Sequence, residues 1–251
     1  MAKIPVALQL YTVRDMTEKD FLGTLAQVAK IGYKAVEFAG TGDLKAPDLR
    51  KALDDLGLRA MGMHVGFDDL VNPGRLAGVI DYARTIGCGF FALSGNHESA
   101  AAWRKFGQDL SKAGEQTLQA GIVLCFHNHS AEFKVYEGKP GLEILYEVAD
   151  PRFLKAQVDV YWVQHGGQDP ATFIRNHAGR CPTIHCKDME QGPDRFFAEV
   201  GEGILDWPGI FQACETVGGT EWYIVEQDLC RRPSIESARI SFENLRKWGK
   251  V

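Results

Sequence analysis

Strand-like and helix-like segments alternate eight times along the 251 residues of this chain. The strand-like segments are short runs rich in β-branched and aromatic residues, and amphipathic stretches follow them, several of which end at a glycine. The expected strands lie in the runs 4–11, 33–39, 58–65, 90–94, 121–133, 153–162, 181–189 and 221–228. The expected helices are 17–31, capped by Thr17, and then 48–56, 73–86, 100–119, 141–148, 170–178, 207–217 and 234–248. This alternation predicts an α/β protein with a single (β/α)8 barrel domain over residues 1–251, and an open doubly wound sheet is the alternative.

Each of the last four strand-like runs ends in a polar cluster that contains a metal-ligand type of side chain. These side chains are Glu132, Asp159, His185 and Glu226. Because the carboxyl ends of parallel strands gather on one face of a barrel, we expect the four to converge. Crowded carboxylates are costly unless a cation neutralises them, so the pattern predicts a divalent metal ion. Three carboxylates and one imidazole suit Mn²⁺ first, with Mg²⁺, Co²⁺ or Fe²⁺ as alternatives.

Charge and hydropathy exclude several classes of partner. The net charge is −5, and no dense block of Lys or Arg appears, so a nucleic-acid partner is not expected. The amino terminus lacks the pattern of a signal peptide, and no apolar stretch approaches the roughly 20 residues of a membrane span. The six cysteines form no CxxC pair, which indicates reduced thiols. We therefore expect a cytoplasmic protein with no membrane partner.

Further polar residues are expected at the same mouth of the barrel. Glu37, His64 and Lys187 follow or end other strands, and we assign them to the binding of substrate hydroxyl groups, with ion pairs at the rim as the alternative. His127 and His129 occupy alternate positions and so point the same way. They are candidates either to donate to substrate oxygens or to support the metal ligands.

Six motifs in order along the chain resemble those of a known superfamily. They are LQLYTVRD (8–15), GYKAVEF (32–38), FHNHSAEF (126–133), DVYWV (159–163), HCKD (185–188) and VGEGILDW (200–207). The chain is similar to the sugar phosphate isomerase/epimerase superfamily, the xylose isomerase-like TIM barrels. The resemblance implies a Glu, Asp, His, Glu metal set, which Asp159, His185 and Glu226 match. Many relatives carry Glu where this chain has His127, so the first ligand is Glu132 or His127, and we assign it to Glu132.

The resemblance also implies an activity and limits it. Ketose 3-epimerases of the superfamily tend to have His where this chain has Trp162, an aromatic residue that would stack on a sugar ring or pack at the rim. The implied chemistry is isomerisation or epimerisation of a small carbohydrate through an enediolate, with Glu226 and Glu132 as the proton-transfer pair and His129 as a further catalytic candidate. Loss of a β-oxygen from the same intermediate would make the enzyme a dehydratase or lyase acting on an inosose or 3-keto sugar. A sugar-binding barrel without catalysis is the remaining alternative, and a homo-oligomer is left open.

Overall fold

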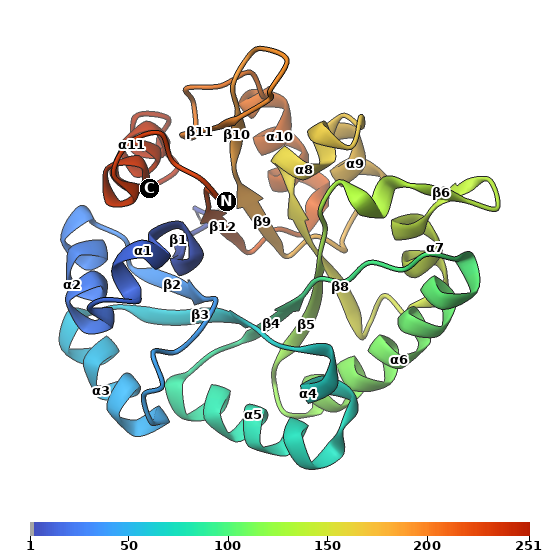
Figure 1. Cartoon of the computed structure of the whole chain (residues 1–251), viewed down its shortest axis with the longest axis horizontal. Coiled ribbons are helices and arrows are strands. Elements are labelled where there is room, and N and C mark those ends of the chain that lie inside the picture. The colour runs from blue at the N-terminus through green and yellow to red at the C-terminus, as the bar shows by residue number, and fades with distance from the viewer. Residues whose placement is uncertain (1–2) are drawn as a thin grey trace.

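A computed structural model describes residues 3–251 and forms a closed barrel of eight parallel strands with helices around it (Figure 1). Around the barrel the strands are ordered β1-β12-β9-β8-β5-β4-β3-β2. Their bounds are β1 Val6–Gln9, β2 Ala35–Phe38, β3 Arg59–His64, β4 Phe90–Leu93, β5 Val123–His127, β8 Leu154–Asp159, β9 Thr183–Cys186 and β12 Trp222–Val225. Each lies within one of the eight runs expected to form strands, and the (β/α)8 fold class is confirmed.

Helices connect the strands on the outside of the barrel (Figure 1). They are α1 Arg14–Thr17, α2 Phe21–Ile31, α3 Ala46–Leu56, α4 Phe67–Val71, α5 Pro73–Ile86, α6 Ala100–Gln119, α7 Gly141–Val148, α8 Val160–His165, α9 Pro170–Asn176, α10 Trp207–Ala213 and α11 Ser234–Lys247. The expected N-cap at Thr17 is wrong. Thr17 ends the short helix α1, and Asp20 caps α2 by accepting a hydrogen bond from the backbone of Gly23. Among residues 3–251, no helix is both long and apolar enough to cross a membrane.

Short hairpins and helical turns lie in the loops between the barrel strands and helices. Two antiparallel hairpins are formed by β6 Val135–Tyr136 with β7 Lys139–Pro140 and by β10 Asp188–Met189 with β11 Phe197–Ala198. The single turns are η1 Leu10–Val13, η2 Ala131–Phe133 and the π-helical turn η3 Cys214–Gly218. The run 153–162 does not stay extended to its end. Asp159 ends β8 and caps α8 by accepting from the backbone N–H of Trp162, so Trp162 lies on a helix.

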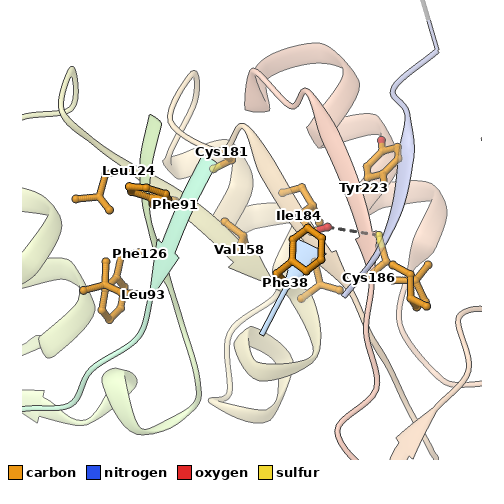
Figure 2. Close-up of a cluster of buried hydrophobic side chains, with 14 of the residues drawn as sticks. Phe38, Phe91, Leu93, Leu124, Phe126, Val158, Cys181, Ile184, Cys186 and Tyr223 are labelled. Atoms are coloured by element: carbon orange, nitrogen blue, oxygen red, sulfur yellow. Dashed lines mark hydrogen bonds between the residues drawn. The ribbon is translucent and has the colours of Figure 1, made fainter. Parts of the chain in front are cut away.

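Side chains alternate between the two faces of each strand. Those that point outward pack against the helices and form the main hydrophobic core, including Phe38, Phe91, Phe126, Val158 and Ile184 (Figure 2). Those that point inward form a second, smaller cluster of Ala7, Ala35, Met61, Phe90, Cys125 and Ile224. The period of two therefore separates a helix-packing face from a barrel interior.

The upper layer of the interior is polar. It contains four buried residues, each of which follows a member of the inner apolar cluster by two positions: Gln9, Glu37, His127 and Glu226. Strand register then sets the neighbours, since Gln9 pairs with Glu37, His127 with Gln157, and Asp159 with His185. The apolar layer closes the floor of the barrel, and the polar layer faces the carboxyl ends of the strands.

Candidate active site

Four ligand-type side chains meet at the carboxyl ends of β5, β8, β9 and β12. One nitrogen or oxygen atom from each of His127, Asp159, His185 and Glu226 lies within 4.8 Å of the others, and all four side chains are buried. Three of the four residues are those predicted from the strand ends. The fourth is His127, whereas Glu132 is not a member of this set.

Glu37 lies beside the four-residue cluster, in the same polar layer, and links His185 to Gln9 and Gln157. Its Oε2 accepts from Gln9 Nε2 at 2.7 Å and pairs with His185 Nε2 at 2.8 Å. Its Oε1 accepts from Gln157 Nε2 at 2.6 Å. Gly62 leaves room for this carboxylate, because a Cβ atom at that position would lie 3.0 Å from Glu37 Oε1. Glu37 is fully buried and is therefore a support of the cluster in this structure, with its oxygens already occupied.

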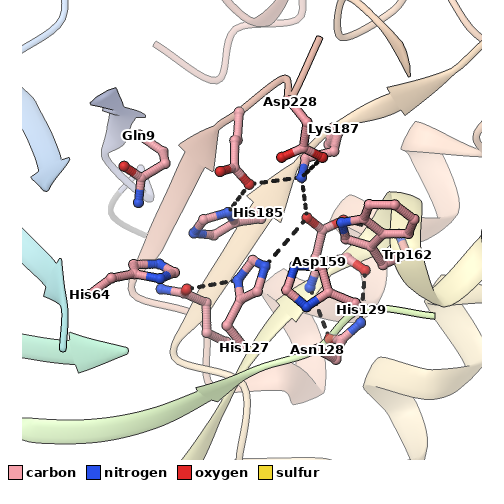
Figure 3. Close-up of polar contacts among 12 residues, drawn as sticks. Gln9, His64, His127, Asn128, His129, Asp159, Trp162, His185, Lys187 and Asp228 are labelled. Carbon is pink, nitrogen blue, oxygen red and sulfur yellow. Dashed lines mark hydrogen bonds and ion pairs between the residues drawn. The ribbon is translucent and has the colours of Figure 1, made fainter. Parts of the chain in front are cut away.

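Lys187 brings a buried ammonium group to the carboxylates. Its Nζ lies 2.8 Å from Glu226 Oε2 and 2.9 Å from both Asp159 Oδ2 and Asp228 Oδ2 (Figure 3). The contact with Asp228 is aligned as a hydrogen bond. Asp159 Oδ1 accepts from the backbone of Trp162, whereas Asp159 Oδ2 is a buried oxygen without a hydrogen-bond partner among the described residues.

The charges of the cluster are strongly coupled. Burial opposes a charge on His185, but the carboxylates of Glu37 and Glu226 outweigh it and raise the pKa of this imidazole to about 10. Burial likewise opposes ionisation of Glu226, but Lys187 and His185 hold its pKa well below the ordinary value. Burial, together with the nearby His185 and His64, holds the pKa of His127 well below 6.5, so His127 is neutral.

The donor set fits a divalent cation. The carboxyl groups of Glu37, Asp159, Glu226 and Asp228 lie against only two basic groups, His185 and Lys187. Burial raises the pKa of Asp159 in spite of Lys187, and the neighbouring Glu226 adds to this effect, so the carboxylate of Asp159 is incompletely compensated. Asp159 Oδ2 is held by the ion pair with Lys187 without an aligned hydrogen bond, and the neutral imidazole of His127 lies 3.9 Å away, so both could act as ligands. Buried uncompensated carboxylates are the electrostatic signature of a cation site.

A cavity of about 330 Å³ opens directly beside the cluster. Its walls are Gln9, Tyr11, Ala39, His64, Ser94, His127, His129, Trp162, Glu226 and Asp228. His64 also approaches Glu37, with Nε2 at 3.4 Å from Oε2. This volume falls at the lower end of the range for small-molecule sites, and the lining combines aromatic and polar groups.

Glu132 and His129 form a pair at the edge of the cavity. Glu132 sits in η2, is buried, and accepts from the backbone N–H of His129 at 3.0 Å. Its other oxygen lies 3.5 Å from His129 Nδ1. Burial would lower the pKa of His129, but the hydrogen bond and charge of Glu132 outweigh it and raise that pKa. The imidazole lines the cavity, and the carboxylate behind it does not.

The remaining predicted residues are divided between the cavity and its support. His64, His127 and Trp162 line the cavity, whereas Glu37 and Lys187 lie behind it. Three polar residues at the site, Gln9, Gln157 and Asp228, were not predicted from the sequence. The period of two would have indicated two of them, because Gln157 precedes Asp159 by two residues and Asp228 follows Glu226 by two.

Fold and site together define a parallel (β/α)8 barrel with a buried His/Asp/Glu cluster at the carboxyl ends of its strands. The family model of the xylose isomerase-like TIM barrels matches residues 25–248, and the chain belongs to this family. The resemblance described from the sequence motifs is thereby confirmed.

Individual relatives are distant. An inosose dehydratase from Geobacillus kaustophilus is 23% identical over 247 residues, which cover 81% of this chain and 79% of that protein. Other curated relatives align over about half of their own length. A solved sugar phosphate isomerase/epimerase from Parabacteroides distasonis has a TM-score of 0.87 at 24% identity, covering 100% of this chain and 96% of that one. D-psicose 3-epimerase from Clostridium cellulolyticum has a TM-score of 0.75 at 13% identity, covering 97% and 98%. These two structures show the shared fold.

Proposed function

We propose that the protein is a metal-dependent dehydratase that acts on a small polyhydroxylated ketone, such as an inosose or a 3-keto sugar. One observation carries the proposal. The cavity beside the four-residue cluster is lined by an ionised carboxylate, Glu226, and by an imidazole, His129, whose pKa is raised. A base and an acid thus face the same small-molecule site.

The metal ion would be held by His127, Asp159, His185 and Glu226. His185 would release a proton on binding it, because an imidazole that coordinates a metal ion must have an unprotonated nitrogen. When bound, a divalent cation would polarise the substrate carbonyl and so acidify the neighbouring C–H bond. Two imidazoles and two carboxylates suit Mn²⁺, Fe²⁺, Co²⁺ or Zn²⁺ better than Mg²⁺, which prefers oxygen ligands. Mn²⁺ remains our first assignment.

The side chains then divide the proton transfers. A carboxylate oxygen of Glu226 removes the proton from the carbon next to the carbonyl. Nδ1 of His129 is turned toward Glu132, which leaves Nε2 to donate a proton to the departing β-hydroxyl group. The C–O bond breaks, water leaves, and a double bond forms beside the carbonyl. Glu132 contributes by keeping His129 protonated until that step.

The position of Glu132 favours elimination over epimerisation. Epimerisation through two carboxylates needs Glu132 and Glu226 on opposite sides of one carbon, but Glu132 is buried behind His129 and does not line the cavity. Elimination needs one base and one acid, which Glu226 and His129 supply. The name of the inosose dehydratase relative also supports this choice over the isomerase or epimerase activity that the sequence analysis placed first.

The test is incubation of the Mn²⁺-loaded protein in D₂O with a panel of inososes, 3-keto sugars and ketoses. A dehydratase should produce the ultraviolet absorbance of a conjugated enone and place solvent deuterium in recovered substrate or product. Deuterium incorporation with a new epimer and no enone would instead assign an epimerase. Neither signal, in protein with stoichiometric metal, would refute both activities and leave a sugar-binding barrel. Glu226→Gln, which removes the base at nearly constant shape, is the control for enzyme-catalysed exchange.

A further inference from the structure

We propose that Gln157 is a positioning residue that fixes the tautomer of His127, so that the unprotonated Nε2 of this imidazole faces Asp159. The inference rests on the proposed metal site, because it explains how a histidine serves as the ligand from β5. The buried amide of Gln157 does not line the cavity. It contacts the four-residue cluster through its hydrogen bond with His127, and its other hydrogen bond goes to Glu37.

The direction of the hydrogen bonds is set by a backbone amide. The N–H of Tyr11 can only donate, and it donates to Gln9 Oε1 at 3.1 Å. The amide nitrogen of Gln9 is therefore the atom that faces Glu37, and it donates to Oε2 at 2.7 Å. Glu37 acts as an acceptor at this point, and its Oε2 also contacts His185 and His64.

Because Glu37 accepts hydrogen bonds, Gln157 must donate to it. Paired with His185, Glu37 is an acceptor at both oxygens, so the atom of Gln157 that lies 2.6 Å from Oε1 is the NH₂ group. The carbonyl oxygen of Gln157 must then be the atom that lies 2.9 Å from His127 Nδ1. An amide oxygen can only accept, which places the proton of neutral His127 on Nδ1.

The consequence appears on the other side of the ring. His127 Nε2 carries a lone pair and faces Asp159 Oδ2 at 3.9 Å (Figure 3). Among the described residues, Asp159 Oδ2 makes an ion pair with Lys187 at 2.9 Å but no aligned hydrogen bond. A metal ion held by His127 and Asp159 would need this nitrogen unprotonated. The opposite tautomer would place a proton in this gap and remove a ligand.

The experiment reads the tautomer directly in the metal-free protein. Long-range ¹⁵N–¹H correlation spectra of protein labelled at its histidines distinguish Nδ1–H from Nε2–H, and His127→Gln identifies the signals of His127. We expect wild-type His127 to be protonated at Nδ1. Protonation at Nε2 in the wild-type protein would overturn the inference without any variant at position 157.

Two matched variants separate positioning from packing. Gln157→Met keeps the volume but cannot hydrogen-bond, so His127 should shift toward the Nε2–H form, whose proton would face Asp159. Gln9→Met removes the other amide that donates to Glu37 but does not touch His127, and the tautomer should be unchanged. If Gln157→Met retains the wild-type proportion of Nδ1–H, Gln157 does not set the tautomer.

Metal affinity supplies the second measurement. By equilibrium dialysis, Gln157→Met should bind Mn²⁺ about 10- to 100-fold more weakly than wild type, the usual effect of losing a residue that orients a ligand. Gln9→Met should lose less than Gln157→Met, and equal losses would overturn the specific role of Gln157. If the wild-type protein shows the expected tautomer but binds no metal ion, the proposed function fails while the hydrogen-bond assignment stands.

Discussion

Replacing Lys187 with methionine should destabilise the metal-free protein strongly. The ammonium group is fully buried and lies within 2.9 Å of oxygens from Asp159, Glu226 and Asp228. Lys187→Met keeps most of the side-chain volume, so the change is chiefly one of charge. Of these three carboxylates, only Glu226 would then keep a cationic partner, which is His185.

The expected loss follows from the burial of the partners. Removing one member of a buried ion pair typically costs about 3–5 kcal/mol, because the partner is left uncompensated. The loss should not greatly exceed this range, since Asp159 can take up a proton in place of the missing cation. At about 2–4 °C per kcal/mol for a chain of this size, the melting temperature should fall by roughly 6–20 °C.

Urea unfolding in the presence of a chelator measures the loss, and the same titration with Mn²⁺ measures its recovery. A divalent cation at 100 times its dissociation constant adds about 2.7 kcal/mol to a folded protein that binds it. The matched control is Lys51→Met, which breaks the exposed pair with Asp55 and should leave stability unchanged. A loss in Lys187→Met below about 1 kcal/mol, the size of an exposed pair, would refute the compensating role of the ammonium group.

Four further predictions test the site. His127→Ala should weaken Mn²⁺ binding by more than about 100-fold whereas Glu132→Gln should not, and the reverse order would return the fourth ligand to Glu132. Glu132→Gln should also move the alkaline limb of the pH–rate profile to lower pH, because His129 loses the carboxylate that raises its pKa, and an unmoved limb excludes His129 as the acid. Glu226→Asp should retain metal yet lose about 10²- to 10⁴-fold in deuterium exchange, so wild-type exchange would exclude Glu226 as the base. In metal-free protein, the raised pKa of His185 contributes stability that is complete below about pH 6.5 and is lost as the pH rises to about 10. His185→Gln should therefore flatten the dependence of stability on pH in this range. An unchanged dependence would show that His185 is not the titrating group.

Much of the barrel could be predicted because its signals are local. The bounds of α5, α6 and α7 agree with the sequence prediction. Pro73 and Gly87 mark the limits of α5, and Gly121 follows the end of α6, through their backbone preferences. The helix α8 was missed for an equally physical reason. Its residues are apolar and aromatic like those of a strand, and only the capping carboxylate of Asp159 shows that the chain turns there.

The candidate site was predictable as a set of strand ends but not as a set of contacts. The alternation of side chains along a strand places Asp159, His185 and Lys187 on the inner face of the barrel. Glu132 lies beyond the end of β5, where no such periodicity holds, and the turn η2 directs its carboxylate to His129. Sequence spacing after a strand end therefore does not say which side of the cavity a side chain reaches.

The partners of each charged group depend on residues far apart in the chain. Glu37 contacts His185 across 148 positions and Gln157 across 120, and both contacts arise from the register of strands that close the barrel. Local sequence can supply a carboxylate, an imidazole and an amide at the right faces, but only closure decides that the amide oxygen meets Nδ1 of His127. In the tautomer that we propose, this contact places the proton of the imidazole on Nδ1. The nitrogen that β5 would offer to a metal ion then depends on the closed barrel and not on the FHNH motif alone.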